Sequence, residues 1–392
     1  MTTPDLSSHA DGLLPEDAAA ATLVGRVFDP AVGGPCVVAV RGERVVDLTH
    51  VEPTVSDLLE RPDRVQVARE HPADRSWPLR GLLADTLAGR TDVAHLLAPV
   101  DLQVLKAAGV TFVRSMVERV VEERAGGDPA RAQALRQRLE DAVGGTIASV
   151  RPGSAEAADV ERVLRAEGLW SQYLEVGIGP DPEIFTKAPV LSAVGAGARV
   201  GVLARSTWNN PEPELVLVAT SRGEAVAATL GNDVNLRDVE GRSALLLGRA
   251  KDNNASCAIG PFLRLFDREF TLDDAATSEV DLRICGPDGF SLHGRSAVGE
   301  ISRPLPELLR HTHGAHHSYP DGFALFTGTM FAPTTDRSGP GSGFTHRVGD
   351  VVAISSARLG TLVNVVDTAE AAPPWTVGIR ALTANLAARG VL

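Results

Sequence analysis

The sequence predicts a mainly β protein of the α+β class, built from three segments. From residue 169 to the C-terminus, short runs of β-forming residues alternate with glycine, proline, asparagine and aspartate, which is typical of a β-rich domain. Residues 101–168 show helical periodicity instead, and residues 1–100 mix short elements of both kinds. We therefore expect a small mixed α/β N-terminal domain (1–100), a helical segment (101–168) and a β-rich domain (169–392).

The composition restricts the class of protein. The 392 residues carry 38 basic and 50 acidic side chains, which gives a formal net charge of −12. An acidic chain without basic clusters is a poor candidate for binding nucleic acid or anionic membranes. No stretch approaches the roughly 20 apolar residues of a membrane span, and the polar N-terminus does not have the pattern of a signal peptide. Three widely separated cysteines indicate a reducing compartment, so we expect a cytoplasmic protein.

The N-terminal segment starts with a polar stretch, residues 1–16, which we expect to be a disordered tail. A β-hairpin is expected next, because two β-type runs, residues 35–40 and 44–48, flank the turn-forming residues 41–43. Mixed short elements continue from there to residue 100.

The helical segment carries an apolar stripe at the spacing of one helix face, formed by Val113, Met116, Val117, Val120 and Val121. Further helices are expected at residues 132–143 and 154–167, separated by glycine-containing breaks. This insertion could form a lid that shuts a binding site from water.

The β-rich domain is predicted from a series of short runs. They are residues 198–203, 212–220, 225–230, 280–285, 323–327, 350–354 and 361–366. Glycine and proline separate these runs, and the spacing favours an all-β arrangement.

The most informative run begins with Glu212-Pro213-Glu214. Side chains two residues apart on a strand share one face, so Glu212 and Glu214 point the same way, and Pro213 marks a strand start or an edge strand. The residues 221–223 then turn the chain. A turn centred on residues 222–223 places Asp233 opposite Glu212 across the hairpin.

Three carboxylates in one place would repel each other and raise each other's pKa. A divalent cation removes this repulsion, and ligation by carboxylates alone favours Mg²⁺, Mn²⁺ or Ca²⁺ over zinc. The alternative is a solvated pair of glutamates on an exposed edge strand. The facing aspartate favours the metal site formed by Glu212, Glu214 and Asp233.

Five motifs occur in an order that resembles the fumarylacetoacetate hydrolase family. Besides Glu212-Pro213-Glu214, they are Phe185-Thr186-Lys187-Ala188-Pro189, Asn232-Asp233-Val234-Asn235-Leu236-Arg237-Asp238 with the later Lys251 and Gly260-Pro261, Thr327-Gly328-Thr329, and Gly349-Asp350-Val351 with Leu359-Gly360-Thr361-Leu362-Val363-Asn364. They span residues 185–366, whereas the N-terminal segment is covered only loosely.

The resemblance implies a fold and a site. The fold is a rolled β-sheet around a metal, with a small N-terminal domain, and members are commonly dimers or larger. By motif match, Glu212, Glu214 and Asp233 hold Mg²⁺, Mn²⁺ or Ca²⁺. Lys251 matches the family lysine, and Thr329 helps to bind the carboxylate or oxo groups of a 2-oxo acid.

One departure from the family pattern bears on the reaction. Members that hydrolyse C–C bonds carry a His/Glu pair that activates water, and here the histidine position aligns with Ser115 while the glutamate remains as Glu118. Serine cannot act as such a base near pH 7. The alternative is that both residues simply lie on an exposed polar helix face and have no catalytic role. With residues 170–180, the pattern is similar to the family branch that dehydrates 2-keto-3-deoxy-pentonates to 2,5-dioxopentanoate.

The corresponding mechanistic hypothesis starts from a metal chelated by the substrate's C1 carboxylate and C2 carbonyl, which makes the C3 proton acidic. Lys251 or Glu118 removes that proton, and the C4 hydroxyl leaves with a proton from Glu118 or water. The C3–C4 alkene formed in this way loses a C5 proton and gains a proton at C3, and the resulting C4–C5 enol tautomerises to the aldehyde. Arg237 and Thr329 are expected to anchor the substrate, with a weaker expectation for Lys187, which could be a surface residue or lie behind the site.

Two other functions remain open at this point. One is a C–C hydrolase or decarboxylase acting on fumarylacetoacetate-like or acylpyruvate-like dioxo acids, against which Ser115 argues. The other is a metal-dependent sensor of sugar acids without catalysis, against which Lys251 and Glu118 argue.

Overall fold

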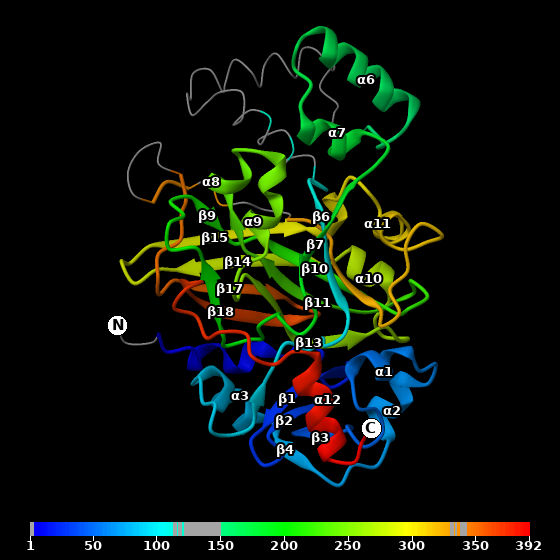
Figure 1. Ribbon diagram of the computed structural model, residues 1–392, viewed down its shortest axis with the longest axis vertical. Coiled ribbons are helices and arrows are strands. Elements are labelled where there is room, and N and C mark those ends of the chain that lie inside the picture. The colour runs from blue at the N-terminus through cyan, green and yellow to red at the C-terminus, as the bar shows by residue number, and fades with distance from the viewer. Residues whose placement is uncertain are drawn as a thin grey trace.

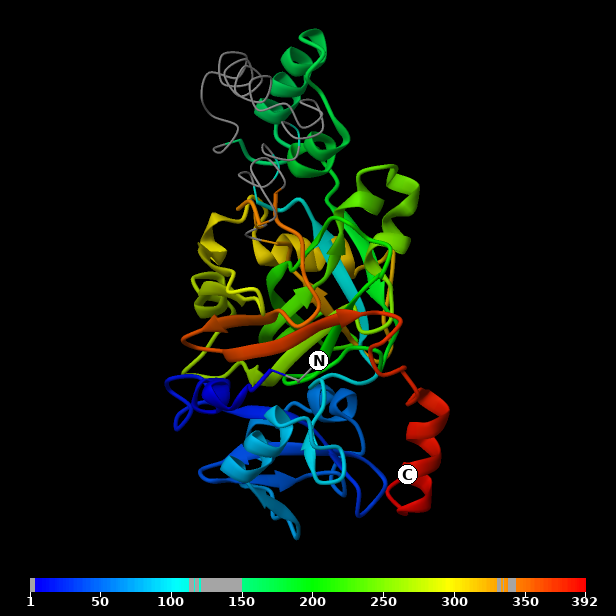
Figure 2. The ribbon, with the colours of Figure 1, turned by 90° about the vertical axis from the view of Figure 1, so that its left-hand side faces the viewer.

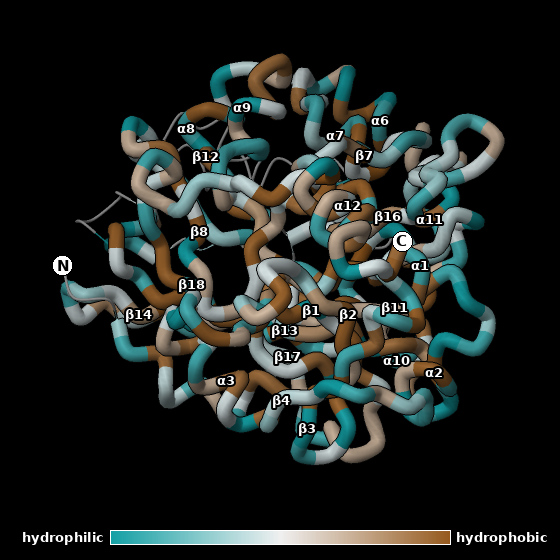
Figure 3. Tube along the Cα trace, turned by 60° about the horizontal axis from the view of Figure 1, so that its bottom comes forward, coloured by the Kyte–Doolittle hydropathy of each residue, from teal (hydrophilic) through white to brown (hydrophobic). Residues whose placement is uncertain are grey.

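The computed structural model describes residues 4–112, 116, 120, 150–329, 333, 335–337 and 343–392. Its core is two β-sheets, with the N-terminal segment at one end and a pair of helices at the other (Figure 1). Seen from the side, the C-terminal helix lies along the N-terminal end of the molecule (Figure 2). In Figure 3, hydrophobic stretches follow the strands and hydrophilic ones the surrounding loops.

Within the described residues, the larger sheet has eleven strands, and the N-terminal segment contributes several of them. In spatial order the strands are β4 (Ser76–Pro78), β3 (Arg44–Asp47), β2 (Gly34–Arg41), β1 (Leu23–Asp29), β13 (Cys257–Leu265), β11 (Ala225–Asp233), β10 (Pro213–Ala219), β16 (Phe323–Phe326), β6 (Val104–Gly109) and β7 (Glu183–Ala188), with β5 (His95–Leu96) paired to β1. The sheet is therefore continuous from the N-terminal segment into the later part of the chain.

The smaller sheet has five strands and lies against the larger one. Its order is β15 (Ser291–Ala297), β14 (Glu279–Cys285), β17 (Val351–Ser356), β18 (Gly360–Thr368) and β8 (Arg199–Val202). A separate pair is formed by β9 (Asn209–Asn210) and β12 (Asn235–Leu236). Buried residues of both sheets, such as Leu215, Leu230, Ile354 and Leu362, belong to one hydrophobic cluster.

Helices cover the sheets and connect their strands. Among the described residues, the α-helices are α1 (Val55–Glu60), α2 (Arg64–Glu70), α3 (Leu79–Leu87), α6 (Ala155–Ala166), α7 (Gln172–Ile178), α8 (Arg237–Glu240), α9 (Leu247–Lys251), α10 (Leu272–Ala276), α11 (Leu305–Thr312) and α12 (Ile379–Ala388), and short 3₁₀ helices are η1 (Ser7–Leu13), η3 (Ala244–Leu246) and η4 (Val298–Glu300). In the described part of the chain, no helix is long and apolar enough to cross a membrane.

The predicted fold class is confirmed. Both sheets contain the β-type runs expected after residue 169, and the N-terminal hairpin forms as β2 and β3, with Arg41 paired to Arg44 across a turn where Gly42 has a φ of +56°. The helix expected at residues 154–167 is α6, and Ser154 caps its N-terminus. Of the apolar stripe, Met116 and Val120 are described, and both are buried beside α6 and α7.

Two local expectations are corrected. The tail expected to be disordered is ordered at residues 7–13, where η1 is anchored because Leu6, just before it, and Leu13, its last residue, are buried in the core. Residues 104–109, expected to be helical, form β6 because they pair in parallel with β16 and antiparallel with β7. The division into three domains stays a prediction.

Candidate metal centre and pocket

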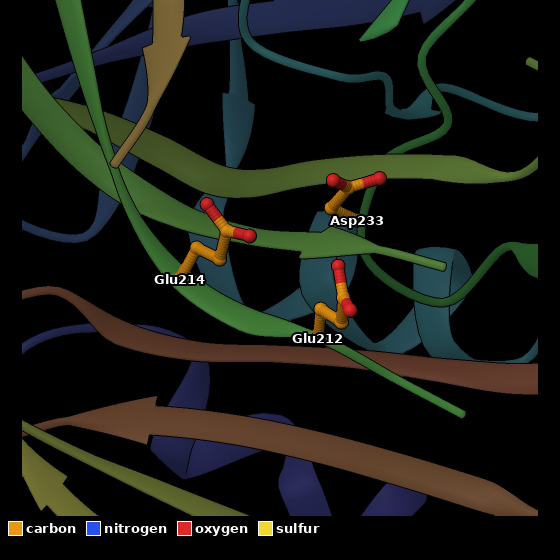
Figure 4. Close-up of side chains that lie close together, drawn as sticks. All are labelled: Glu212, Glu214 and Asp233. Carbon is orange, nitrogen blue, oxygen red and sulfur yellow. The ribbon is translucent and has the colours of Figure 1, made fainter. Parts of the chain in front are cut away.

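The three predicted carboxylates meet on one hairpin. Glu212 immediately precedes β10, Glu214 lies on it, and Asp233 is the last residue of the neighbouring β11 (Figure 4). Pro213 pairs with Asn232 and Glu214 with Gly231, which is the predicted register, and the Asp233 amide donates to the Glu212 carbonyl at 3.0 Å. The predicted register is therefore confirmed.

The hairpin differs from expectation in two details. β10 starts at Pro213 as predicted, but it is an interior strand, because β16 pairs with it on the side away from β11. The register also slips by one residue between Val218 and Ala219, close to the turn at Gly223. The end of the hairpin that carries the three carboxylates keeps the predicted pairing, because the slip lies near the turn at the other end.

The carboxylates form a compact buried cluster. Each offers one oxygen, and these oxygens lie within 4.8 Å of one another. Glu212, Glu214 and Asp233 are at most 2% exposed. Three buried carboxylate oxygens at such distances are a fitting donor set for a hard divalent cation, so the triad can hold a metal ion.

Two lysines neutralise part of this negative charge. Lys251, the last residue of α9, contacts Glu212 Oε2 and donates to Asp233 Oδ2 at 2.9 Å. Lys187 Nζ lies 2.8 Å from Asp233 Oδ1. Burial would raise the pKa of Asp233, but the ammonium groups of Lys187 and Lys251 hold it below its usual value.

Glu214 has a different environment from Asp233. Its pKa is raised well above the ordinary value, first by burial and then by the charges of Asp233 and Glu212. The backbone N–H of Gly328 donates to Glu214 Oε2 at 2.7 Å, which acts in the opposite direction. A bound cation would counteract the rise, because it compensates the neighbouring negative charges.

Lys251 is held as an ammonium group. Burial alone would lower its pKa, but Asp233, Glu212 and Glu240 outweigh burial and raise it. Its Nζ also lies 5.8 Å from the centre of the Phe185 ring. A divalent cation on the same carboxylates would lower the pKa of Lys251 and favour proton transfer from it.

The triad opens into a small pocket. Its lining residues are Ala108, Gly109, Val110, Glu183, Phe185, Glu212, Glu214, Asp233, Glu240, Lys251 and Thr329. Of the predicted residues, the structure thus brings Lys251 and Thr329 together with the metal-binding triad.

The other predicted residues lie elsewhere. The Arg237 guanidinium stacks over Trp208 at 4.5 Å, at the start of α8. Lys187 is fully buried behind Asp233, so in this conformation it has no exposed atom with which to touch a substrate. Ser115 and Glu118 lie outside the described residues, and their roles stay predictions.

Two pocket carboxylates were missed by the sequence analysis. Glu183 and Phe185 both line the pocket from β7, so the strand alternation before the matched Phe185 could have revealed Glu183. A Cβ atom at Gly109 would lie 1.8 Å from Glu183 Oε2, so the absence of a side chain at residue 109 makes room for this carboxylate.

The second missed carboxylate is Glu240 on α8. Asn235 is buried, and its amide Nδ2 donates to both Glu240 Oε2 and Glu212 Oε1, the latter at 3.1 Å. This amide therefore connects a metal-binding carboxylate to a carboxylate on the helix above the pocket. The signal in the sequence was weak, because Glu240 becomes a pocket residue only when β12 and α8 fold back over the hairpin.

Metal binding is expected to stabilise the protein. A cation that binds only the folded state adds about 2.7 kcal/mol of unfolding free energy at a concentration of 100 times its Kd. We therefore expect Mg²⁺ or Mn²⁺ to raise the thermal unfolding temperature of protein previously treated with a chelator. The same titration on Glu214→Gln should give a much smaller rise, and equal rises in both proteins would contradict a metal site at the triad.

The described residues form packed β-sheets with a buried carboxylate triad that can hold a divalent cation, and this fold is shared with solved enzyme structures. A solved 2-keto-3-deoxy-D-arabinonate dehydratase, complexed with magnesium and 2,5-dioxopentanoate, superposes with a TM-score of 0.61 and 21% identity over 88% of this chain and 99% of that one. A 2-hydroxyhepta-2,4-diene-1,7-dioate isomerase from Mycobacterium marinum gives a TM-score of 0.51 at 18% identity, covering 89% and 99% of the two chains. At these identities the likeness establishes the fold.

Sequence comparison also finds dehydratases of 2-keto-3-deoxy sugar acids. A probable 2-keto-3-deoxyxylonate dehydratase of Haloferax volcanii is 32% identical over 196 residues, 50% of this chain and 64% of the relative. A 2-dehydro-3-deoxy-D-arabinonate dehydratase of Saccharolobus solfataricus is 30% identical over 185 residues, 47% of this chain and 58% of the relative. The matches thus span less than two thirds of either relative, and no family model matches. The resemblance to sugar-acid dehydratases is confirmed.

Proposed function

We propose that this protein is a metal-dependent hydro-lyase that dehydrates a 2-keto-3-deoxy-pentonate to 2,5-dioxopentanoate. The observation that carries the proposal is the buried triad of Glu212, Glu214 and Asp233, open to a small pocket that also contains Lys251 and Glu183. Support comes from the fold shared with a dehydratase whose structure contains magnesium and 2,5-dioxopentanoate.

Mg²⁺ is the proposed cofactor, with Mn²⁺ and Ca²⁺ as alternatives. The donor set consists of carboxylate oxygens, which all three ions accept. When bound, the ion supplies Lewis-acid activation of a 2-oxo acid, which makes the adjacent C3 proton easier to remove. Glu212, Glu214 and Asp233 would hold it.

The protein groups then have separate tasks. A base removes the C3 proton, and the C4 hydroxyl leaves as water after accepting a proton, which forms a C3–C4 double bond. Loss of a C5 proton and return of a proton to C3 then give the C4–C5 enol of 2,5-dioxopentanoate, so the pocket groups handle both sets of proton transfers. Lys251 and Glu183 both line the pocket, from α9 and β7 respectively, and are the described candidates for these tasks. Thr329 lines the pocket as well and is proposed to bind the substrate's oxygen atoms. Arg237 does not line the pocket, so any contact it makes with the substrate would be at the edge of the site.

Glu183 is an additional candidate for the catalytic acid or base. The sequence analysis named Lys251 and Glu118, and Glu118 lies outside the described residues. Because Glu183 stands in the pocket in a described position, we propose it as the second proton-handling group beside Lys251. The roles expected for Ser115 and Glu118 stay predictions.

The direct test is an assay of the purified protein with 2-keto-3-deoxy-xylonate or 2-keto-3-deoxy-arabinonate and Mg²⁺. We expect 2,5-dioxopentanoate, measured by coupling to an aldehyde dehydrogenase that reduces NAD(P)⁺. Acylpyruvates and fumarylacetoacetate-like dioxo acids serve as comparison substrates. Turnover of those alone, with C–C bond cleavage or loss of CO₂, would replace the dehydratase by the hydrolase or decarboxylase alternative.

Location and assembly stay predictions. Cys36, Cys257 and Cys285 are free thiols, which supports the cytoplasmic location expected from the sequence. A homodimer or homotetramer is proposed from the family resemblance, and size-exclusion chromatography with light scattering would determine the state.

A further inference from the structure

The chain uses lysine very sparingly. Of its 38 basic residues, only Lys106, Lys187 and Lys251 are lysines, and all three are buried. Two of them contact the same carboxylate, Asp233. Arginine and lysine differ at such sites, because lysine presents a compact charge with three donors and arginine a planar fork. A chain built almost entirely with arginine thus has lysines at both positions beside its metal-binding aspartate.

The two lysines contact Asp233 from different sides. Lys187 takes Oδ1, whereas Lys251 takes Oδ2 and also contacts Glu212. Lys251 lines the pocket, and Lys187 is 0% exposed. The oxygen held by Lys251 therefore lies on the side of the cluster that a cation would enter, and the oxygen held by Lys187 lies behind it.

Lys187 is held from two sides. Its ammonium group forms an ion pair with Asp233 Oδ1 and donates hydrogen bonds to the backbone carbonyls of Val234, at 3.2 Å, and of Lys251. One of these carbonyls belongs to the residue after the metal-binding aspartate, and the other belongs to Lys251 itself.

We propose that Lys187 is a positioning residue of the metal site. It fixes Asp233 through Oδ1 so that Oδ2 is directed to the cation, and it fixes the end of α9 through the Lys251 carbonyl. When a cation binds, it is then the ammonium group of Lys251, and not that of Lys187, that moves away from the carboxylates. This inference rests on the metal site of the proposed function, but not on the identity of the substrate.

The inference is testable because loss of the positive charge of Lys187 and loss of its positioning role change the metal affinity in opposite directions. Removing a positive charge beside three carboxylates makes the site more negative and by itself strengthens cation binding. Loss of a residue that orients a metal-binding group typically weakens metal affinity 10–100-fold. The direction of the change in affinity thus separates a positioning residue from a mere neutralising charge.

The first experiment measures Mn²⁺ affinity of chelator-treated protein by calorimetry and by electron paramagnetic resonance. We expect Lys187→Met to bind Mn²⁺ about 10–100-fold more weakly than the wild type. Lys187→Arg keeps the charge but not the geometry, and we expect it to be weakened at least about tenfold. Unchanged or tighter binding by either folded variant would overturn the inference.

Lys106→Met is the matched control. Lys106 is also buried, lies on the adjacent strand β6, and donates to Thr186 Oγ1 of β7 at 3.0 Å, so it tests the loss of a buried lysine beside the same strand. Its Mn²⁺ affinity should equal that of the wild type within about twofold. Failure of the wild type to bind Mn²⁺ at the triad would instead reject the proposed metal site itself.

A second experiment uses the wild-type protein and does not depend on whether the variants fold. With only three lysines, reductive methylation followed by mass spectrometry reports each one separately. Lys187 should stay unlabelled with and without Mg²⁺, because it is fully buried and held against Asp233. Ready labelling of Lys187 in the folded protein would overturn the inference.

Discussion

Replacement of Glu214 by glutamine is expected to abolish dehydration while leaving the fold intact. Glutamine has the same shape and can still accept the N–H of Gly328, but it removes one of the three anionic ligands. We expect turnover to fall at least about 10²-fold even with excess Mg²⁺. Initial rates measured across a Mg²⁺ titration would check this.

The same variant should not be less stable than the wild type in the absence of metal. The pKa of Glu214 is raised because its carboxylate is buried beside two others, so a neutral amide relieves an unfavourable interaction. Glu224→Gln, at the exposed turn of the same hairpin, is the control and should keep full activity. Full activity of Glu214→Gln, or of enzyme stripped of metal, would reject the metal role.

Glu183→Gln is expected to lower kcat by about 10²–10⁴-fold, which is the usual contribution of a general acid or base. Glu183 lines the pocket but is not one of the three clustered ligands, so Mn²⁺ affinity should stay the same. Steady-state kinetics combined with a metal titration would separate this effect from that of Glu214→Gln.

Asp181→Asn provides the matched control for Glu183. Asp181 is an exposed carboxylate two residues earlier in the chain, and its loss should leave kcat unchanged. If Glu183→Gln retains its kcat while Lys251→Met loses it, the proton transfers belong to Lys251 and another group. The assignment of Glu183 as a proton-handling residue would then be withdrawn.

The sequence was sufficient for the metal-binding hairpin because its information is local. The turn at residues 221–223 determines the pairing of β10 with β11, and the alternation of a strand places Glu212 and Glu214 on one side. Asp233 follows from the same register. No contact beyond this hairpin was needed to predict that the three carboxylates converge.

The parts that sequence analysis missed depend on distant partners. Residues 104–109 include leucine, lysine and two alanines, which favour helix in isolation, yet they pair with β16 and β7 and become a strand. Glu183 and Glu240 become pocket residues only through β7 and α8, which reach the hairpin from elsewhere in the chain. Their place is a property of tertiary structure.

The pairing of β1 with β13 has a consequence for protein engineering. β13 lies between β1 and β11, and β11 carries Asp233 at its end. A fragment that starts after residue 100 would lose β1 and expose the backbone edge of β13 one strand away from the metal ligand. Because uncovered edge strands invite intermolecular pairing, such a fragment should aggregate instead of serving as a minimal enzyme.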